Sequence, residues 1–176
     1  MADRIAARPD WAEAQRRFSI EAEEAGLAGD LRAGLNACVE CCDRHCGENR
    51  LALRCVSATG ALAEYTFEDL RHLAGQAANL LRDKGVRPGD VVAGMLPRRI
   101  ELVALILGTW RLGAVYQPLF TAFGPKAIEH RLATSGAKLV VVDSANRAKL
   151  DEVAGCPQIA TLRAGEVELA PGDVDF

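Results

Sequence analysis

The residues best suited to chemistry crowd into one short segment, Cys38 to Cys46. This cysteine segment holds four of the six cysteines and one histidine. Thiolates and imidazole are the usual ligands of zinc. On a helix, however, the pair Cys38 and Cys42 points about 60° away from the pair Cys41 and His45. No second cysteine or histidine pair follows to complete four ligands. We therefore favour a helix that uses cysteine as a small apolar residue, with no metal.

A second candidate is the stretch GAVYQPLFTAFGP, residues 113–125. It predicts a short strand at 114–119, a turn at 120–124 and a helix that begins at Pro125. In α/β sheets, ligands bind outside the carboxyl ends of the strands. Helix N-termini attract anions, and small residues let a ligand approach the backbone. The alternative is that Phe120 and Phe123 simply cap the core.

The sequence lacks the common phosphate-binding loop motifs and the usual hydrolase triad. It contains neither G-x-x-x-x-G-K-[ST] nor G-x-G-x-x-G. No Ser-His-Asp arrangement stands out. His72 and His130 fall on the polar sides of their predicted helices, so we expect both to be solvated.

Composition narrows the class of protein. The chain has 176 residues, 49% of them hydrophobic, which is typical of one globular domain. A net charge of −3 gives no sign of the basic face that nucleic-acid binding needs, so we expect no nucleic-acid partner. The start of the chain lacks a secretory signal pattern, and the longest apolar run, residues 102–110, is too short to span a membrane. We expect a cytoplasmic protein in which Cys55, Cys156 and the other cysteines form no disulfide framework.

Hydrophobic periodicity predicts the elements that would position these residues. Helices are expected at 11–27, 35–46, 66–84, 98–111, 125–135 and 146–153. Strands are expected at 51–57, 61–66, 91–95, 114–119, 138–142, 159–162 and 166–169. Residues 51–66 form a hairpin, and Pro97 should lie in the first turn of its helix. The alternation of strands and helices from residue 61 onward predicts half of a doubly wound, largely parallel α/β sheet.

Four motifs in a fixed order resemble the adenylate-forming (AMP-binding) superfamily. They are YTFEDL at 65–70, GVRPGD at 85–90, PRRIE at 97–101 and RLGAVY at 111–116. Within the superfamily, FTAFGP at 120–125 and NACVECCDRH at 36–45 resemble acyl-CoA synthetases of the acetyl-CoA synthetase type. The resemblance covers about residues 30–176. It implies the first βα subdomain of the large N-terminal domain, a mostly parallel sheet flanked by helices with an N-terminal hairpin.

The resemblance also implies a reaction and some site residues. In this family a carboxylate attacks the α-phosphate of ATP–Mg²⁺, and the thiol of coenzyme A (CoA) then attacks the acyl-adenylate. The loop after the core strand lies near CoA, which implies Phe120, Thr121, Ala122 and Phe123. A basic pair after the VVVD strand meets the 3′-phosphate. Arg147 matches its first member, and the second falls on Leu150, so Lys149 is the candidate substitute. The alternative for Arg147 is a solvated residue at a helix start.

The resemblance places no catalytic residue in this chain. The phosphate loop of the family should follow a segment like GDVDF, residues 172–176, and the ATP and Mg²⁺ sites and the catalytic lysine lie further on. We therefore expect residues 1–34 to be a helical extension and residues 35–176 a partial AMP-binding domain that ends before the phosphate loop.

Three hypotheses follow for the function. The first is the N-terminal part of an acyl-CoA synthetase, inactive alone, whose carboxylic acid the sequence does not identify. The second is a non-catalytic α/β module that binds a ligand or a partner chain. The third is a zinc protein built on the cysteine segment. An incomplete sheet would leave apolar surface exposed, for example on the 98–111 helix, and could drive self-association.

Overall fold

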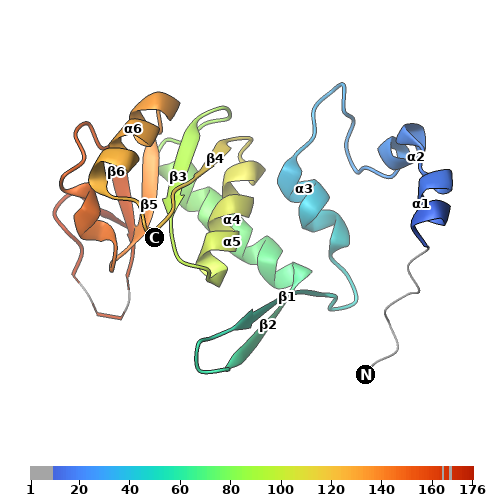
Figure 1. Cartoon of the computed structure of the whole chain (residues 1–176), viewed down its shortest axis with the longest axis horizontal. Coiled ribbons are helices and arrows are strands. Elements are labelled where there is room, and N and C mark those ends of the chain that lie inside the picture. Colours follow the sequence, from blue (N-terminus) through green and yellow to red (C-terminus); the bar gives the residue numbers. More distant parts are fainter. Residues whose placement is uncertain (1–9, 164, 167) are drawn as a thin grey trace. The chain divides into compact units, whose positions relative to one another are not determined.

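The computed structural model describes residues 10–163, 165–166 and 168–176 of the chain (Figure 1). It divides into two compact units, Met1–Leu35 and Asn36–Phe176. From residue 10 onward, the first unit holds two short helices, α1 (Trp11–Arg17) and α2 (Ile20–Ala25). The second holds the sheet and all remaining helices.

The single helix predicted at 11–27 is wrong, because the chain breaks at Phe18 and Ser19. Phe18 has extended backbone angles, and the Ser19 hydroxyl accepts a hydrogen bond from the Ala22 amide to start α2. Neither helix buries a residue within this unit, and Trp11 is 80% exposed. The apolar spacing that predicted one long helix therefore has no core here to hold it straight.

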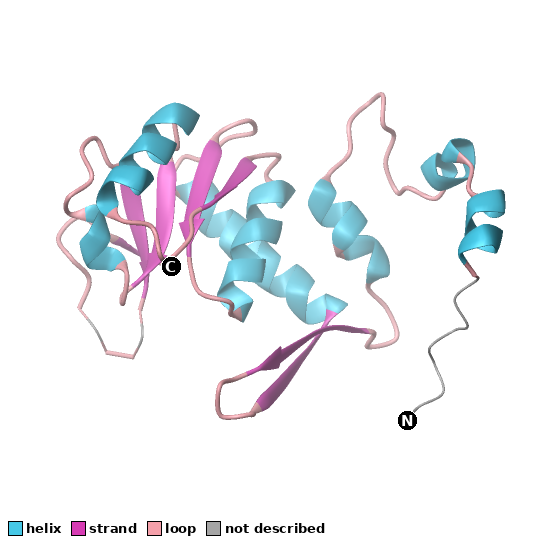
Figure 2. Cartoon of the chain, viewed as in Figure 1, coloured by secondary structure: helices cyan, strands magenta, loops and turns pink. Residues whose placement is uncertain are grey.

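A five-stranded parallel sheet confirms the predicted α/β class (Figure 2). Its strands in spatial order are β4 (Val115–Pro118), β3 (Val91–Met95), β5 (Leu139–Asp143), β6 (Gln158–Leu162) and β7 (Val174–Asp175). From β3 the chain first moves outward to β4 and then crosses back to β5. The winding direction therefore reverses between β3 and β5, which is where ligands bind in doubly wound sheets.

Alternate residues of the central strands feed two separate cores. Val92, Leu139 and Val141 pack with helices α4 (Phe67–Asp83) and α5 (Ile100–Arg111). Ala93, Val140 and Val142 pack on the other face, with α6 (Pro125–Ser135) and the 3-10 helix η2 (Arg147–Leu150). This period of two is the expected consequence of strand geometry, and it confirms a sheet covered on both faces.

Helix α4 begins and ends where its sequence predicts. Thr66 and Asp69 form a reciprocal capping box at its start, and Gly85 adopts the left-handed φ of 81° just after its end. Helix α5 crosses it closely at Gly108, where an added Cβ would lie 2.7 Å from the Ala77 Cβ. Every residue of α5 is buried or half-buried, so the expectation of an exposed apolar face on the 98–111 helix is wrong.

The predicted hairpin is present as β1 (Leu51–Val56) and β2 (Leu62–Thr66), paired antiparallel. Its turn end carries the exposed apolar pair Val56 and Leu62, which face each other across the strands at 69% and 58% exposure. Leu51, Val115 and Phe120 are the other large apolar side chains that are exposed among the described residues of this unit.

Four boundaries differ from the sequence-based prediction. The 35–46 helix is only α3 (Ala37–Cys41), because Asn36 caps the Cys38 and Val39 amides, and a 3-10 turn η1 (Asp43–His45) follows. Likewise, the 146–153 helix shortens to η2.

Pro97 precedes α5 rather than lying in it, since Arg99 is the extended N-cap residue. The last strand is β7 at 174–175, not 166–169, because it is there that the chain pairs with β6; residue 167 lies outside the described residues. Within the part of the chain that the structure describes, no helix has the length and apolar character to cross a bilayer.

Candidate functional site

The candidate site lies at the carboxyl edge of the parallel sheet. The β4–α6 loop (residues 119–124) follows the end of β4. Residues 144–150 follow the end of β5, which is separated from β4 in the sheet by β3. Leu119 is buried and donates its amide to the Gly94 carbonyl of β3, at 2.9 Å, which extends the ladder to the first residue of the loop. The topology thus brings the two predicted CoA segments to the same edge.

The two phenylalanines of the loop have different environments. Phe123 is half-buried against the core of α6, and the Arg131 guanidinium lies 4.1 Å above its ring. Phe120 is 69% exposed, with its ring centroid 6.0 Å from that of Phe123. A tight turn closes the loop, with the Phe123 amide donating to the Phe120 carbonyl at 2.9 Å. Phe123 therefore caps the core, as one alternative predicted, whereas Phe120 presents an open aromatic face.

Lys149 contacts the β4–α6 loop directly. Its Nζ donates to the Thr121 carbonyl at 2.5 Å and to the Asn146 Oδ1 at 2.8 Å. The Asn146 Nδ2 in turn donates to the Asp143 carboxylate at 2.7 Å, at the end of β5. The structure therefore brings Lys149 and Thr121 together, and the exposed Ala122 lies beside them in the chain.

Arg147 points instead at two carboxylates. Its Nε and one terminal nitrogen donate to Asp173 at 2.6 and 3.0 Å, and the other terminal nitrogen donates to Asp151 at 2.7 Å. Burial disfavours the charge on Asp173, but the bonds from Arg147 and Thr161 outweigh it and hold the pKa of that carboxyl below its ordinary value. With only 16% of its side chain exposed, Arg147 is not the solvated residue of the alternative hypothesis.

The cysteine segment packs as an apolar element. Cys38 and Cys42 are fully buried against Leu70 and Leu107. Burial raises the pKa of both thiols, that of Cys42 to about 12. Across the described residues, no group of three or more His, Cys, Asp or Glu side chains is placed to hold a metal ion. The structure thus offers the zinc hypothesis no cluster in that part of the chain.

The family-like motif around the cysteines ties α3 to α5. Asn36 donates to the Arg111 carbonyl at 3.1 Å, and the Arg111 guanidinium donates to the Asp43 carboxylate at 2.6 Å. No local sequence pattern pairs Asn36 or Asp43 with Arg111, because 75 and 68 residues separate them along the chain.

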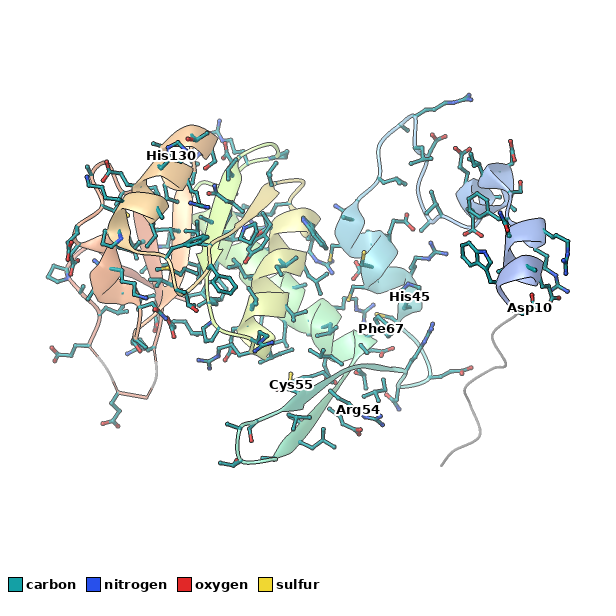
Figure 3. All side chains as sticks on the ribbon, viewed as in Figure 1. Asp10, His45, Arg54, Cys55, Phe67 and His130 are labelled. Carbon is teal, nitrogen blue, oxygen red and sulfur yellow. The ribbon has the colours of Figure 1, made fainter. Side chains whose placement is uncertain are left out.

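The three histidines do not form a catalytic group. His45 lies beside Phe67, with ring centroids 5.2 Å apart and the ring planes tilted by 46° (Figure 3). His72 and His130 are exposed on different helices, which confirms the expectation that both are solvated.

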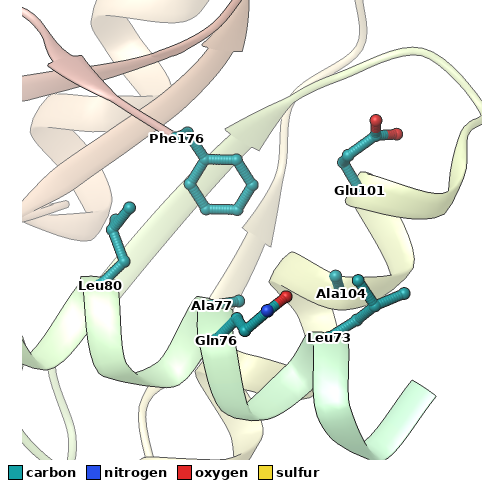
Figure 4. Close-up of a pocket in the computed structure, with 7 residues that line it drawn as sticks. All are labelled: Leu73, Gln76, Ala77, Leu80, Glu101, Ala104 and Phe176. Atoms are coloured by element: carbon teal, nitrogen blue, oxygen red, sulfur yellow. The ribbon is translucent and has the colours of Figure 1, made fainter. Parts of the chain in front are cut away.

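Other cavities lie among the described residues of the second unit. One of about 220 Å³ lies between α4 and α5, where Leu73, Leu80 and Ala104 face the ring of Phe176 (Figure 4). Two more, of about 480 and 490 Å³, flank the hairpin and share Arg98 and Arg99. Arg99 is engaged by Glu101 through two bonds of 2.6 and 2.7 Å. None of the predicted CoA residues lines these three cavities.

Comparisons with known proteins point to one family. The profile of "AMP-binding enzyme" matches residues 41–171. An acetyl-coenzyme A synthetase of Campylobacter jejuni is 38% identical over 109 residues, covering 61% of this chain and 17% of that protein. A 3-hydroxypropionyl-coenzyme A synthetase of Sulfurisphaera tokodaii is 32% identical over 148 residues, covering 81% and 22%.

A solved structure adds a match over nearly the whole chain. The crystal structure of a Brucella canis acyl-CoA synthetase superimposes with a TM-score of 0.89 at 58% identity, covering 94% of this chain and 31% of that one. The chain thus spans about a fifth of the length of the curated relatives cited above.

Proposed function

The chain belongs to the AMP-binding enzyme family, and on that basis we propose that it is the N-terminal part of an acyl-CoA synthetase. The observation that carries the proposal is the match to an acyl-CoA synthetase over 94% of the chain at 58% identity. We propose residues 1–34 as a helical extension and residues 35–176 as a partial AMP-binding domain. The compact units Met1–Leu35 and Asn36–Phe176 support this division.

The proposed reaction of the complete enzyme has two steps. A carboxylate oxygen of a small acid attacks the α-phosphorus of ATP, and pyrophosphate leaves. The CoA sulfur then attacks the acyl carbon, and AMP leaves with the bonding electrons. We propose that ATP and Mg²⁺ bind to parts of the enzyme outside this chain, so that the chain alone is inactive. We also propose that the protein is cytoplasmic and has no nucleic-acid partner.

We propose that the carboxyl edge of the sheet faces CoA. Phe120 would stack on the adenine, since its ring is exposed at a strand end, and Thr121, Ala122 and Phe123 would shape the loop beneath it. Arg147 would meet a phosphate through the N–H groups that it does not share with Asp173 and Asp151, since those contacts use three of its five donors. The two carboxylates weaken its attraction for an anion.

Two assays test the proposed function. A pyrophosphate-release assay with ATP, Mg²⁺ and short acids should give no turnover for the 176-residue chain. Calorimetry with CoA should detect binding that Phe120→Ala weakens. Turnover would overturn the prediction of inactivity, and a wild-type chain that binds no CoA would overturn the placement of CoA at this edge. If the gene continues past Phe176, a Gly-rich Ser/Thr loop should follow shortly.

The exposed hairpin tip favours a second candidate, a non-catalytic module that binds a partner chain. Val56 and Leu62 are apolar, adjacent and more than half exposed. Such a pair on a two-stranded ribbon is stabilised when another surface covers it. Light scattering of the wild-type chain and of Val56→Lys separates the outcomes. Self-association that the substitution abolishes favours an apolar interface, whereas a stable monomer in both cases removes self-association through the hairpin.

A further inference from the structure

Few hydrogen bonds hold the β4–α6 loop along its length, although Phe123 packs against the core and under the Arg131 guanidinium. Its entry is fixed by Leu119 in the ladder, and its exit by Gly124 at the start of α6. Between them, the Phe123-to-Phe120 turn is a local bond. Among the described residues, the hydrogen bond from Lys149 to the Thr121 carbonyl is the one polar contact that reaches residues 120–124 from a distant element.

Lys149 is itself oriented by a bridge to the sheet. Asn146 accepts from Lys149 and donates to Asp143. An ammonium group can only donate and a carboxylate can only accept, so the side-chain amide of Asn146 fits between them in one orientation. Asp143 is 9% exposed at the end of β5 and cannot move far. The bridge Asp143–Asn146–Lys149–Thr121 therefore links the end of β5 to the middle of the loop after β4.

We propose that Lys149 is a positioning residue that fixes the conformation of the β4–α6 loop, rather than a direct contact of the CoA phosphate. Two of its three N–H donors are already used by Thr121 and Asn146, and its side chain is half-buried. The effect on ligand binding rests on the proposed function, because it assumes that CoA occupies this loop. The effect on the conformation of the loop does not depend on the proposed function.

The first test measures the loop without any ligand. Amide hydrogen exchange of Phe123 is followed by NMR in the wild-type chain, in Lys149→Met and in Lys149→Arg. Methionine keeps the aliphatic length and removes the donor, and arginine can still donate to the Thr121 carbonyl. We expect exchange to accelerate roughly three- to tenfold in K149M, as for the loss of one hydrogen bond, and to be largely restored in K149R.

Lys126 supplies a matched control. It lies in α6 just after the loop, is 90% exposed and pairs only with Glu129 among the described residues. Lys126→Met removes the same charge without touching the bridge, so the Phe123 exchange rate should stay unchanged. Asn146→Ala should give a smaller acceleration than K149M and little additional effect when combined with it. If K149M left the exchange rate of Phe123 unchanged while its melting temperature matched that of the wild type, the proposal would be overturned.

The second test separates positioning from phosphate contact. Calorimetry compares CoA with dephospho-CoA, which lacks the 3′-phosphate. A positioning role predicts that K149M weakens both ligands by the same factor, whereas a phosphate contact predicts a loss for CoA alone and overturns the proposal. If the wild-type chain bound neither ligand, the proposed function would fail, and the exchange experiment would still decide the role of Lys149 in the loop.

Discussion

The cysteine segment packs against α4 and α5, whereas the β4–α6 loop lies at the open carboxyl edge of the sheet. The first region carries thiols and an imidazole, yet its key thiols are buried and their pKa values are raised by burial. The second carries mostly unreactive side chains, yet it exposes Phe120 beside a backbone held by Lys149. Position in the fold, more than residue type, separates a structural region from a candidate binding region here.

The largest expected effect comes from placing a charge in the cysteine segment. Cys42→Asp would bury a carboxylate among Leu70, Ala74 and Leu107, so we expect a loss of about 3 kcal/mol or more in the free energy of unfolding. Urea denaturation measures it. Cys41→Asp is the matched control, because Cys41 is exposed, and it should cost less than about 1 kcal/mol. Equal losses would contradict the packed role of Cys42.

The contact between Asp43 and Arg111 should matter less than the core but more than a surface ion pair. Asp43→Ala leaves Arg111 partly buried without its partner, so we expect a loss of about 1–3 kcal/mol. Asp83→Ala is the control, because it removes an exposed carboxylate that lies 3.8 Å from the Arg82 guanidinium. It should change the free energy of unfolding by less than about 0.5 kcal/mol. Denaturation of the two variants at the same salt concentration checks the difference.

Alkaline pH should lower the free energy of unfolding through the buried Cys42 thiol. Burial raises the pKa of Cys42 from 9.0 to about 12. The unfolded chain therefore releases this proton at lower pH than the folded one, so its contribution to stability is complete below pH 9.0 and is lost as pH rises toward about 12.

The slope reaches at most about 1.4 kcal/mol per pH unit from this group. Stability measured from pH 8 to about 10.5 in the wild type and in Cys42→Ala isolates it, because Tyr116, whose pKa burial also raises to about 12, is present in both. Parallel curves would show that Cys42 does not contribute.

In the β4–α6 loop we expect a substitution to affect ligand binding more than stability. Phe120→Ala should change the free energy of unfolding by less than about 0.5 kcal/mol, because the ring is 69% exposed. If Phe120 stacks on the adenine of CoA, the same variant should lose about 1–3 kcal/mol of binding free energy. Denaturation and calorimetry on one preparation give both values. A large loss of stability would make Phe120 a core residue instead.

Zinc should have the smallest effect of all. Since no suitable cluster exists among the described residues, adding zinc should leave the melting temperature of the chain unchanged. Metal analysis of protein purified without chelators is the complementary measurement. Stoichiometric zinc that a chelator removes together with stability would restore the third hypothesis.

Local sequence patterns were sufficient for much of the fold. The capping box of Thr66, the run of β3 and the Pro125 start of α6 each depend on neighbouring residues, and each lies where it was predicted. The sheet class followed from the alternation of strands and helices. Predictions failed where a boundary depends on a contact. Because Asn36 is the N-cap, α3 begins two residues after the predicted start at residue 35. The two residues of β7 pair with β6 directly after Asp173, which is bound by Arg147.

The candidate site divides in the same way. The motif order was enough to indicate the family and to select the loop and the two basic residues, because these are properties of residue type and spacing. Their partners were not readable in advance, since Asp173 lies 26 residues from Arg147 and Thr121 lies 28 residues from Lys149. The ends of β4 and β5 meet at one edge of the folded sheet, and this makes Lys149 a support of the loop. The pairing of β7 with β6 brings Asp173, just before β7, to Arg147 and makes Arg147 an ion-paired residue.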